Sequence, residues 1–249
     1  MDTILPPLPA MPPGTLPRVL LAGATGLVGG YLLRALVDDP GIGLITVLTR
    51  RPLQPASLLG AERAAALPEG RLRIAELDYE HLDKHTDLLQ ADWVFCTLGT
   101  TIAQAGSQEA FRRVDHHYPL QLARRAKVLR AHQFLLVSAV GASADSNLFY
   151  NRVKGEVEDA LRALQFESLT LARPSLLLGD RPKQRLGESL ASHFGWLMPA
   201  RAKPVHAAQV AAGLLAAAHE AQPGVRILDN QALRRMPQAP SLASSPTTA

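Results

Sequence analysis

Short, nearly unbroken apolar runs alternate along this chain with longer segments in which apolar residues recur at helical spacing. Each of three such runs is four or five residues long: residues 19–22, 44–48 and 93–96. Runs of this kind are typical of parallel strands that are buried on both faces. Helical spacing marks three longer segments: residues 27–37, 108–130 and 150–164. The alternation predicts βαβ units with right-handed crossovers, and therefore an α/β fold with a doubly wound parallel sheet.

The remaining apolar segments extend this sheet and end it. Further strands are expected at residues 72–77, 134–138 and 169–172, which makes six in the core sheet, and an edge strand is expected at residues 225–228. After Arg173 and Pro174 the chain turns to Pro, Gly and basic residues. Short helices near residues 186–197 and 207–219 follow, which we assign to a short C-terminal cap on the substrate side, around residues 180–220.

Composition is consistent with one domain inside the cell. A chain of 249 residues with 47% hydrophobic content is long enough for one substantial core. We expect a flexible arm at residues 1–17, a single domain at residues 18–236 and a disordered tail at residues 237–249. The single Cys96 cannot form an intrachain disulfide, and the proline-rich start lacks the features of a secretory signal. These observations favour a cytoplasmic protein.

Charge and hydropathy point away from nucleic acid and membrane partners. The net charge of +4 comes from 26 Lys and Arg against 22 Asp and Glu, and the basic residues are scattered along the chain. The apolar span at residues 19–37 contains Gly23, Gly26 and Arg34, so a strand, a turn and a helix explain it better than a membrane span.

A glycine-rich turn follows the first strand directly, with the sequence Gly23-Ala24-Thr25-Gly26-Leu27-Val28-Gly29. Gly23 permits a tight exit from the strand, Gly26 lets backbone amides approach a pyrophosphate, and Gly29 lets the helix pack close to the sheet. Phosphates would then lie on the positive N-terminus of the helix. The turn therefore predicts a dinucleotide site that includes Gly23, Thr25, Gly26, Leu27, Val28 and Gly29.

The end of the second strand indicates which dinucleotide is bound. A cofactor with a free ribose 2′-hydroxyl calls for an Asp or Glu here, but the chain has Arg50 and Arg51, which can pair with a 2′-phosphate. This favours NADPH over NADH; the alternative is a pair of solvent-exposed arginines. Asp78 follows the third strand and has two equal interpretations, a contact with the adenine amino group or a cap for the next turn.

Tyr150 and Lys154 are four residues apart in the predicted helix 150–164, so they project from one face, near Ser138 at the end of strand 134–138. A neighbouring ammonium favours the phenolate and makes Tyr150 a usable acid. We expect Tyr150 to exchange a proton with the substrate oxygen, Ser138 to hydrogen-bond to that oxygen, and Lys154 to orient the nicotinamide ribose. The alternatives are a strand-end hydroxyl for Ser138 and, for Lys154, an exposed charge paired with Glu158.

Other titratable residues indicate no further chemistry. His116, His117 and His206 have no carboxylate or Cys at a spacing that suits a metal or a catalytic triad. We interpret them as surface or core histidines and expect no metal site.

Taken together, these motifs resemble the atypical and extended short-chain dehydrogenase/reductases, an epimerase-like and NmrA-like superfamily. The chain is most similar there to the small NADPH-binding group typified by the vertebrate Tat-interacting oxidoreductase homologue. The likeness covers residues 18–236 and includes the glycine turn, Cys96-Thr97-Leu98-Gly99-Thr100-Thr101, the segment from Tyr150 to Glu158, and Arg173-Pro174.

The resemblance implies a Rossmann fold, NADP(H) and the three reaction residues above. It also implies that Leu98, Gly99 and Thr100 pass beside the cofactor, and that the segment 174–178, with Pro174 and Leu176, borders the nicotinamide. Two positions depart from the family. Asp115 stands where the extended enzymes have a helix Asn, and Gln209 where an Asp often follows Pro-x-His.

The sequence therefore predicts an NADPH-dependent oxidoreductase that acts on a carbonyl-like small molecule. Two alternatives stay open: an NADPH-binding regulator that has a protein partner and little or no catalysis, and a nucleotide-sugar epimerase or dehydratase. A homodimer is a further possibility. The substrate itself has no signature in the sequence.

Overall fold

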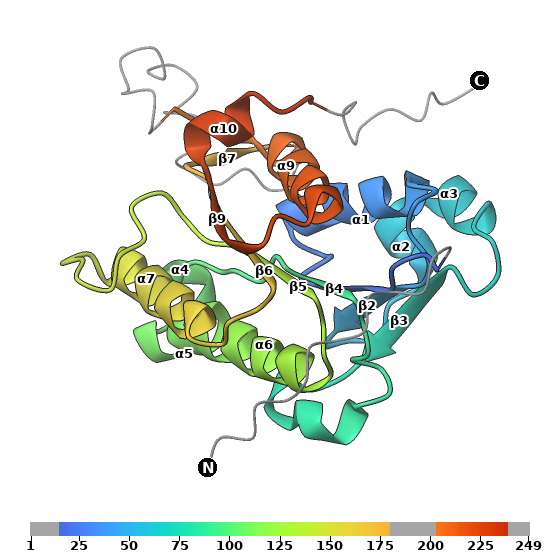
Figure 1. Cartoon of the computed structure of the whole chain (residues 1–249), viewed down its shortest axis with the longest axis horizontal. Coiled ribbons are helices and arrows are strands. Elements are labelled where there is room, and N and C mark those ends of the chain that lie inside the picture. Colours follow the sequence, from blue (N-terminus) through green and yellow to red (C-terminus); the bar gives the residue numbers. More distant parts are fainter. Residues whose placement is uncertain (1–14, 180–202, 239–249) are drawn as a thin grey trace.

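A seven-stranded parallel sheet forms the centre of the protein, which the computed structural model describes over residues 15–179 and 203–238. The strand order is β3-β2-β1-β4-β5-β6-β9, and every pairing is parallel. The bounds are β1 Val19–Ala22, β2 Ile45–Thr49, β3 Leu72–Glu76, β4 Trp93–Cys96, β5 Gln133–Val137, β6 Ser168–Arg173 and β9 Gly224–Asp229. The doubly wound parallel sheet predicted from the apolar runs and the Rossmann fold implied by the resemblance are thereby confirmed (Figure 1), and the expected edge strand becomes the seventh member of the sheet.

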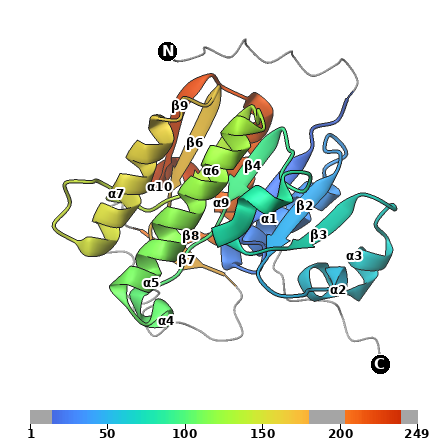
Figure 2. The ribbon, with the colours of Figure 1, turned by 90° about the horizontal axis from the view of Figure 1, so that it is seen from below.

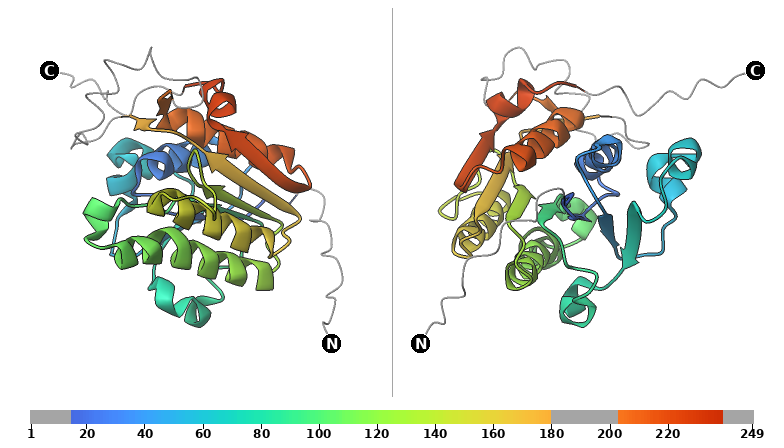
Figure 3. Two further views of the ribbon diagram at one scale, coloured as in Figure 1. Left: turned by 90° about the vertical axis from the view of Figure 1, so that its left-hand side faces the viewer. Right: turned by 45° about the vertical axis from the view of Figure 1, so that its right-hand side comes forward.

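Helices cover both faces of the sheet and bury a separate core against each. On one face lie α1 (Leu27–Asp38) and α9 (Ala207–Glu220), and on the other lie α6 (Tyr118–Val128) and α7 (Phe149–Arg162) (Figure 2). The two views of Figure 3 show the strands between these layers. Strands β1, β4 and β5 send residues to both cores, which explains why their sequences are apolar at nearly every position.

Shorter elements connect these layers. They are α2 Pro55–Leu59, α3 Ala61–Ala65, the 3₁₀ segment η1 Tyr79–His85, α4 Ile102–Ala105, α5 Gln108–Arg112, β7 Leu177–Leu178, β8 Val205–His206 and α10 Asn230–Arg234. The pair β7 and β8 forms a separate two-stranded parallel sheet. In the described part of the chain, no helix is both long enough and apolar enough to cross a bilayer.

The helix predicted at residues 108–130 is interrupted by a π-helical turn, η2 (Arg113–His117), between α5 and α6. The amide of Tyr118 donates to the carbonyl of Arg113, five residues earlier. Pro119 has no amide hydrogen to donate to the carbonyl of Asp115, so the regular α-helical pattern cannot run through this point. The wider turn rotates the following residues relative to α5, and such turns are frequent at functional sites.

The cap assignment is wrong for residues 207–219. That segment is α9, which packs on α1 and on the sheet and belongs to the helical layer of the Rossmann fold. Gly213 of α9 lies close to α10, because a Cβ at this position would lie 2.9 Å from a methyl carbon of Leu233. The predicted helix at residues 186–197 lies outside the described residues, as do most of the N-terminal arm and of the C-terminal tail.

Candidate functional site

The carboxyl ends of the strands border a cleft of about 710 Å³ and a neighbouring cavity of about 130 Å³. The cleft lies over β1, β2 and β4, and the cavity lies between the start of α1, the end of β5 and α7. Both are lined by five shared residues: Gly26, Thr97, Leu98, Gly99 and Thr100. The two spaces are therefore contiguous, with dimensions that suit an extended ligand with one reacting end.

The glycine turn has the geometry that a phosphate site requires. Gly23 has φ +92°, which only glycine adopts without strain, and a Cβ on Gly29 would lie 2.1 Å from the carbonyl oxygen of Gly23. Gly26 is the N-cap of α1 and supplies no side-chain cap. The first amides of α1 therefore remain available for anionic oxygens, at the positive end of a twelve-residue helix. The turn thus fits the pyrophosphate of a dinucleotide.

Thr97 ties this turn to β4, and the sequence interpretation did not single it out. Its hydroxyl donates to the carbonyl of Ala22 at 2.9 Å, so the loop after β4 is held against the glycine turn. Leu98, Gly99 and Thr100 line both spaces; that they pass beside the cofactor stays a prediction of the resemblance. The position of Thr97 directly after a buried strand was the available signal.

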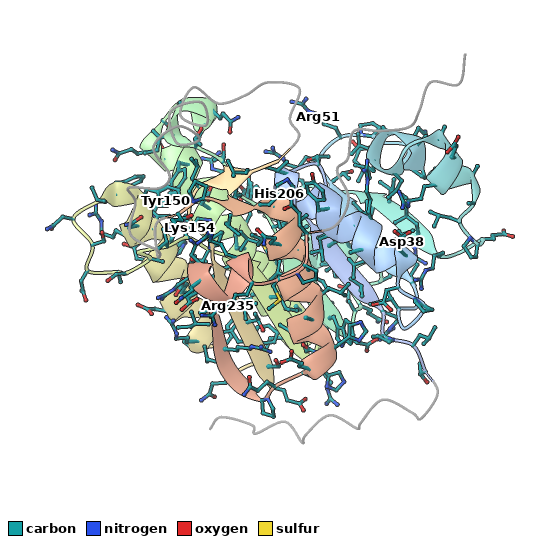
Figure 4. The ribbon with its side chains drawn as sticks, turned by 90° about the horizontal axis from the view of Figure 1, so that it is seen from above. Asp38, Arg51, Tyr150, Lys154, His206 and Arg235 are labelled. Atoms are coloured by element: carbon teal, nitrogen blue, oxygen red, sulfur yellow. The ribbon has the colours of Figure 1, made fainter. Side chains whose placement is uncertain are left out.

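The far end of the cleft contains the predicted arginines. Arg50 and Arg51 are exposed and line it, and Figure 4 shows the position of Arg51. Tyr79 and Tyr118, which the sequence interpretation did not include, also line it, and their rings stack at 5.2 Å. Asp78 accepts a hydrogen bond from the amide of Glu80 at 3.0 Å and caps η1, which is the second of its two interpretations.

Tyr150 and Lys154 lie together on α7 at the smaller cavity, on the other side of the same edge of the sheet (Figure 4). Tyr150 is 38% exposed, and its ring packs against Phe111 with centroids 5.5 Å apart. Among the described residues, its hydroxyl has no hydrogen-bond partner. This phenol is therefore available to a ligand in the cavity.

Lys154 is not the exposed helix charge of the alternative interpretation. Its side chain is 4% exposed, and its Nζ lies 2.7 Å from Oδ1 of Asp115, which is 1% exposed. Burial acts to lower the pKa of Lys154, but attraction from Asp115 and Tyr150 outweighs it and raises the pKa above its usual value. Asp115, whose role was open, is thus the ion-pair partner of Lys154.

Ser138 lines the cavity, but its hydroxyl hydrogen is used elsewhere. Its Oγ lies 2.5 Å from Oε1 of Glu158, a fully buried carboxylate that also accepts from Nε of Arg173 at 3.0 Å and from Nη2 of Arg162 at 3.1 Å. A carboxylate only accepts, so the serine must donate its one hydrogen to Glu158. The expected donation from Ser138 to a substrate oxygen is therefore not the observed arrangement.

The remaining predicted positions are placed as follows. Pro174 lines the smaller cavity, whereas Leu176 is exposed and its neighbours Ser175 and Leu177 line the cavity in its place. Gln209 accepts from the amide of His206 at 3.2 Å, and its own amide donates to the carbonyls of Arg234 and Met236. Gln209 is thus a structural anchor for the chain after α10.

The histidines have structural surroundings. His206 caps α9 through its Nδ1, and its ring packs edge-on to Tyr31. Burial and the charge of Arg112 lower the pKa of His116, whose ring lies next to His117. Over residues 15–179 and 203–238, no group of three or more His, Cys, Asp or Glu is placed to hold a metal ion.

Several known proteins are similar in sequence to most of this chain. A model described as the NAD dependent epimerase/dehydratase family matches residues 19–161. Protein HTATIP2 of Rattus norvegicus is 36% identical over 182 residues, which are 73% of this chain and 71% of that protein. The protein named fmp52, mitochondrial, of Emericella nidulans is 34% identical over 180 residues, 71% of this chain and 74% of that protein.

Solved structures share the fold. MoeE5 in complex with UDP-glucose and NAD has a TM-score of 0.62 at 18% identity, over 84% of this chain and 74% of that one. A UDP-glucuronic acid 4-epimerase from Bacillus cereus, in complex with UDP-glucuronic acid and NAD, has a TM-score of 0.65 at 15% identity, over 85% and 77%. These findings confirm the resemblance expected from the motifs: the chain belongs to the NAD-dependent epimerase/dehydratase family, whose description names the nicotinamide cofactor class that the cleft fits.

Proposed function

We propose that this protein is an NADPH-dependent oxidoreductase of the short-chain dehydrogenase/reductase type, which reduces a carbonyl group of a small molecule. The observation that carries the proposal is the continuity of the two spaces. A cleft with a glycine turn at one side and two arginines at its end leads into a cavity lined by Tyr150 and Lys154. A dinucleotide that lay along the cleft would have its nicotinamide end beside the phenol of Tyr150.

The cofactor part of the proposal rests on the first turn of α1 and on Arg50 and Arg51. The free amides of α1 would hold the pyrophosphate, and the arginines would pair with a 2′-phosphate. Bound NADPH supplies the hydride. A preference over NADH follows because the family position for an acidic ribose partner is basic in this chain.

The reaction part assigns the proton to Tyr150. Hydride arriving at the carbonyl carbon leaves negative charge on oxygen, and the phenol of Tyr150 transfers its hydrogen to that oxygen. Lys154, held by Asp115, would hydrogen-bond to the nicotinamide ribose and stabilise the resulting phenolate. In this assignment Tyr150 is the single proton donor, because the Ser138 hydroxyl is bonded to Glu158.

A screen of aldehydes and ketones for NADPH oxidation tests the proposal, with Tyr150→Phe as the matched variant. The substitution keeps the ring and its packing on Phe111 and removes only the acid. Turnover is expected to fall about 10²–10⁴-fold, while NADPH affinity stays within roughly threefold of the native value. Equal turnover by both proteins would remove Tyr150 from the mechanism.

A second candidate is a nucleotide-sugar epimerase or dehydratase, which the family description and the UDP-sugar complexes of the structural neighbours favour. Incubation of the protein and NAD⁺ with UDP-glucose or UDP-glucuronic acid, followed by chromatography of the sugar nucleotide, distinguishes the two. New sugar products without net change in nicotinamide absorbance would support this candidate over the first.

A third candidate is a cofactor-binding regulator without turnover, favoured by the engagement of Ser138 with Glu158. High NADPH affinity without any product in either screen would support it.

A homodimer or another protein partner is likewise a proposal, which light scattering of the purified protein tests. Cytoplasmic location is proposed from the single buried Cys96, whereas the name of the fmp52 relative points to mitochondria; imaging of a tagged full-length chain decides between them.

A further inference from the structure

The buried ion pair between Lys154 and Asp115 has a property that the proposed reaction does not by itself require. Asp115 uses both of its oxygens: Oδ1 lies 2.7 Å from Nζ of Lys154, and Oδ2 accepts the amide hydrogen of Thr100 at 2.9 Å. Thr100 lines both the cleft and the cavity. One carboxylate thus joins the lysine of α7 to the loop along the cofactor cleft.

Asp115 reaches this position from the π-helical turn and not from a regular helix. The turn places Asp115 at 1% exposure, facing Lys154 on α7. The other charge that helical spacing offers to Lys154, Glu158 at i+4, is bonded to Ser138, Arg173 and Arg162. Within the described residues, Asp115 is the carboxylate that forms a salt bridge with Lys154.

A buried ammonium keeps its charge only if a neighbour compensates for the lost water. Among residues 15–179 and 203–238, the groups that face Lys154 are Asp115 from the π-helical turn, Tyr150 from α7, Cys96 from the end of β4 and the carbonyl of Val137, 3.5 Å away. Of these, Asp115 is the acid at ion-pair distance. Burial raises the pKa of the Cys96 thiol to about 12, so this group carries no charge near pH 7.

We propose that Asp115 is a positioning residue that keeps Lys154 charged beside the cofactor ribose, and that dinucleotide binding becomes dependent on pH once this carboxylate is neutralised. The inference rests on the proposed function, because it places a dinucleotide next to Lys154. It differs from a purely structural role for Asp115, in which loss of the Thr100 contact would weaken binding equally at every pH.

The direction of the effect follows from burial. In Asp115→Asn the side chain has the same shape but no charge, so the effect of burial, which lowers the pKa of Lys154, loses its main compensation; fully buried lysines shift by up to about 3–5 units. Lys154 is then charged at low pH and neutral at high pH. A neutral amine forms a hydrogen bond roughly half as strong as an ammonium does, so dinucleotide affinity falls as pH rises.

The experiment measures NADP⁺ binding by calorimetry at several pH values between about 6 and 9, for the full native chain and for Asp115→Asn. The ratio of the two dissociation constants at each pH removes the titration of the 2′-phosphate, whose pKa is near 6. We expect the dissociation constant of Asp115→Asn, divided by that of the native chain, to increase about fivefold or more from pH 6 to pH 9. A ratio that is constant over this range overturns the inference.

Three variants serve as controls. Lys154→Met should weaken binding by a factor that is independent of pH. Asp115→Glu restores a carboxylate. The ratio of its dissociation constant to that of the native chain should be constant with pH, even where its affinity is lower. Asp38→Asn removes an exposed ion pair with Arg63 at the far end of α1, and its ratio should stay near one.

The failure of this inference is distinguishable from failure of the proposed function. If the native protein binds neither NADP⁺ nor NAD⁺, both are overturned. If the native protein binds and the Asp115→Asn ratio is constant, only the inference fails. Where thermal denaturation shows that Asp115→Asn does not fold, Asp115→Ser replaces it, because the shorter neutral side chain has no amide NH₂ to face the ammonium and leaves Lys154 equally without a carboxylate.

Discussion

Two adjacent glycines of α1 are predicted to respond in opposite ways to the same substitution. A Cβ on Gly29 would lie 2.1 Å from the carbonyl oxygen of Gly23 and 2.6 Å from the hydroxyl of Thr97. A Cβ on Gly30 would meet nothing nearer than the carbonyl oxygen of Ala24, at 3.7 Å. Alanine at position 29 must therefore displace the backbone of the glycine turn, whereas alanine at position 30 fits without movement.

The magnitudes follow from these distances. Overpacking of a tight contact costs about 1–3 kcal/mol, and in a chain of this size each 1 kcal/mol shifts the midpoint of thermal unfolding by about 2–4 °C. Gly29→Ala should therefore lower Tm by roughly 2–12 °C. Gly30→Ala should raise stability by about 0.5–1 kcal/mol, because alanine favours the helix interior.

Thermal denaturation, repeated with and without NADP⁺, measures both effects. Gly29→Ala should also lose most of the stabilisation that NADP⁺ adds, because the displaced turn carries the phosphate amides. Gly30→Ala should keep it. If the two variants had the same Tm and the same response to NADP⁺, the close approach of α1 to the turn would not be what requires glycine at position 29.

Three further predictions concern single side chains. Arg50→Ala or Arg51→Ala should weaken NADPH by an order of magnitude or more and leave NADH nearly unchanged, since a charge-assisted contact contributes about 1.5–3 kcal/mol; fluorescence titration measures this, and equal losses for both nucleotides would contradict a phosphate contact. Ser138→Ala should lower the free energy of unfolding by about 1.5–3 kcal/mol, because Glu158 loses one hydrogen bond, whereas the exposed control Ser57→Ala should change it by less than about 0.5 kcal/mol in the same denaturant titration. Burial raises the pKa of the Cys96 thiol to about 12, so at pH 8 only about one molecule in 10⁴ carries a thiolate and a disulfide reagent should react only after unfolding; rapid reaction of the native protein would show that the site opens.

Local rules were sufficient for the sheet and for the cofactor turn. The apolar runs of β1, β2 and β4 are short and continuous because both faces are buried, and this signal lies wholly within each strand. The glycine turn could also be predicted from the sequence, since it depends on backbone conformation at Gly23 and on spacing to Gly29. Helix α7 followed from the helical spacing of apolar residues over 150–164, and the common face of Tyr150 and Lys154 followed from their four-residue separation.

Local rules did not predict the partner of a buried side chain when several partners were possible. Helical spacing offered Glu158 to Lys154, but the sheet brings Arg173 and Ser138 to Glu158 and the π-helical turn brings Asp115 to Lys154. Likewise, the small apolar residues of α9 suit a cap or a sheet-covering helix equally, and packing on α1 decided between them. Sequence by itself determined the elements, their order and the residue types at the site, because periodicity and backbone conformation are local. Only the tertiary structure decided which charges pair and which hydroxyl is free, because a buried charge takes its partner from whatever strand ends and helix faces the fold brings within hydrogen-bond reach.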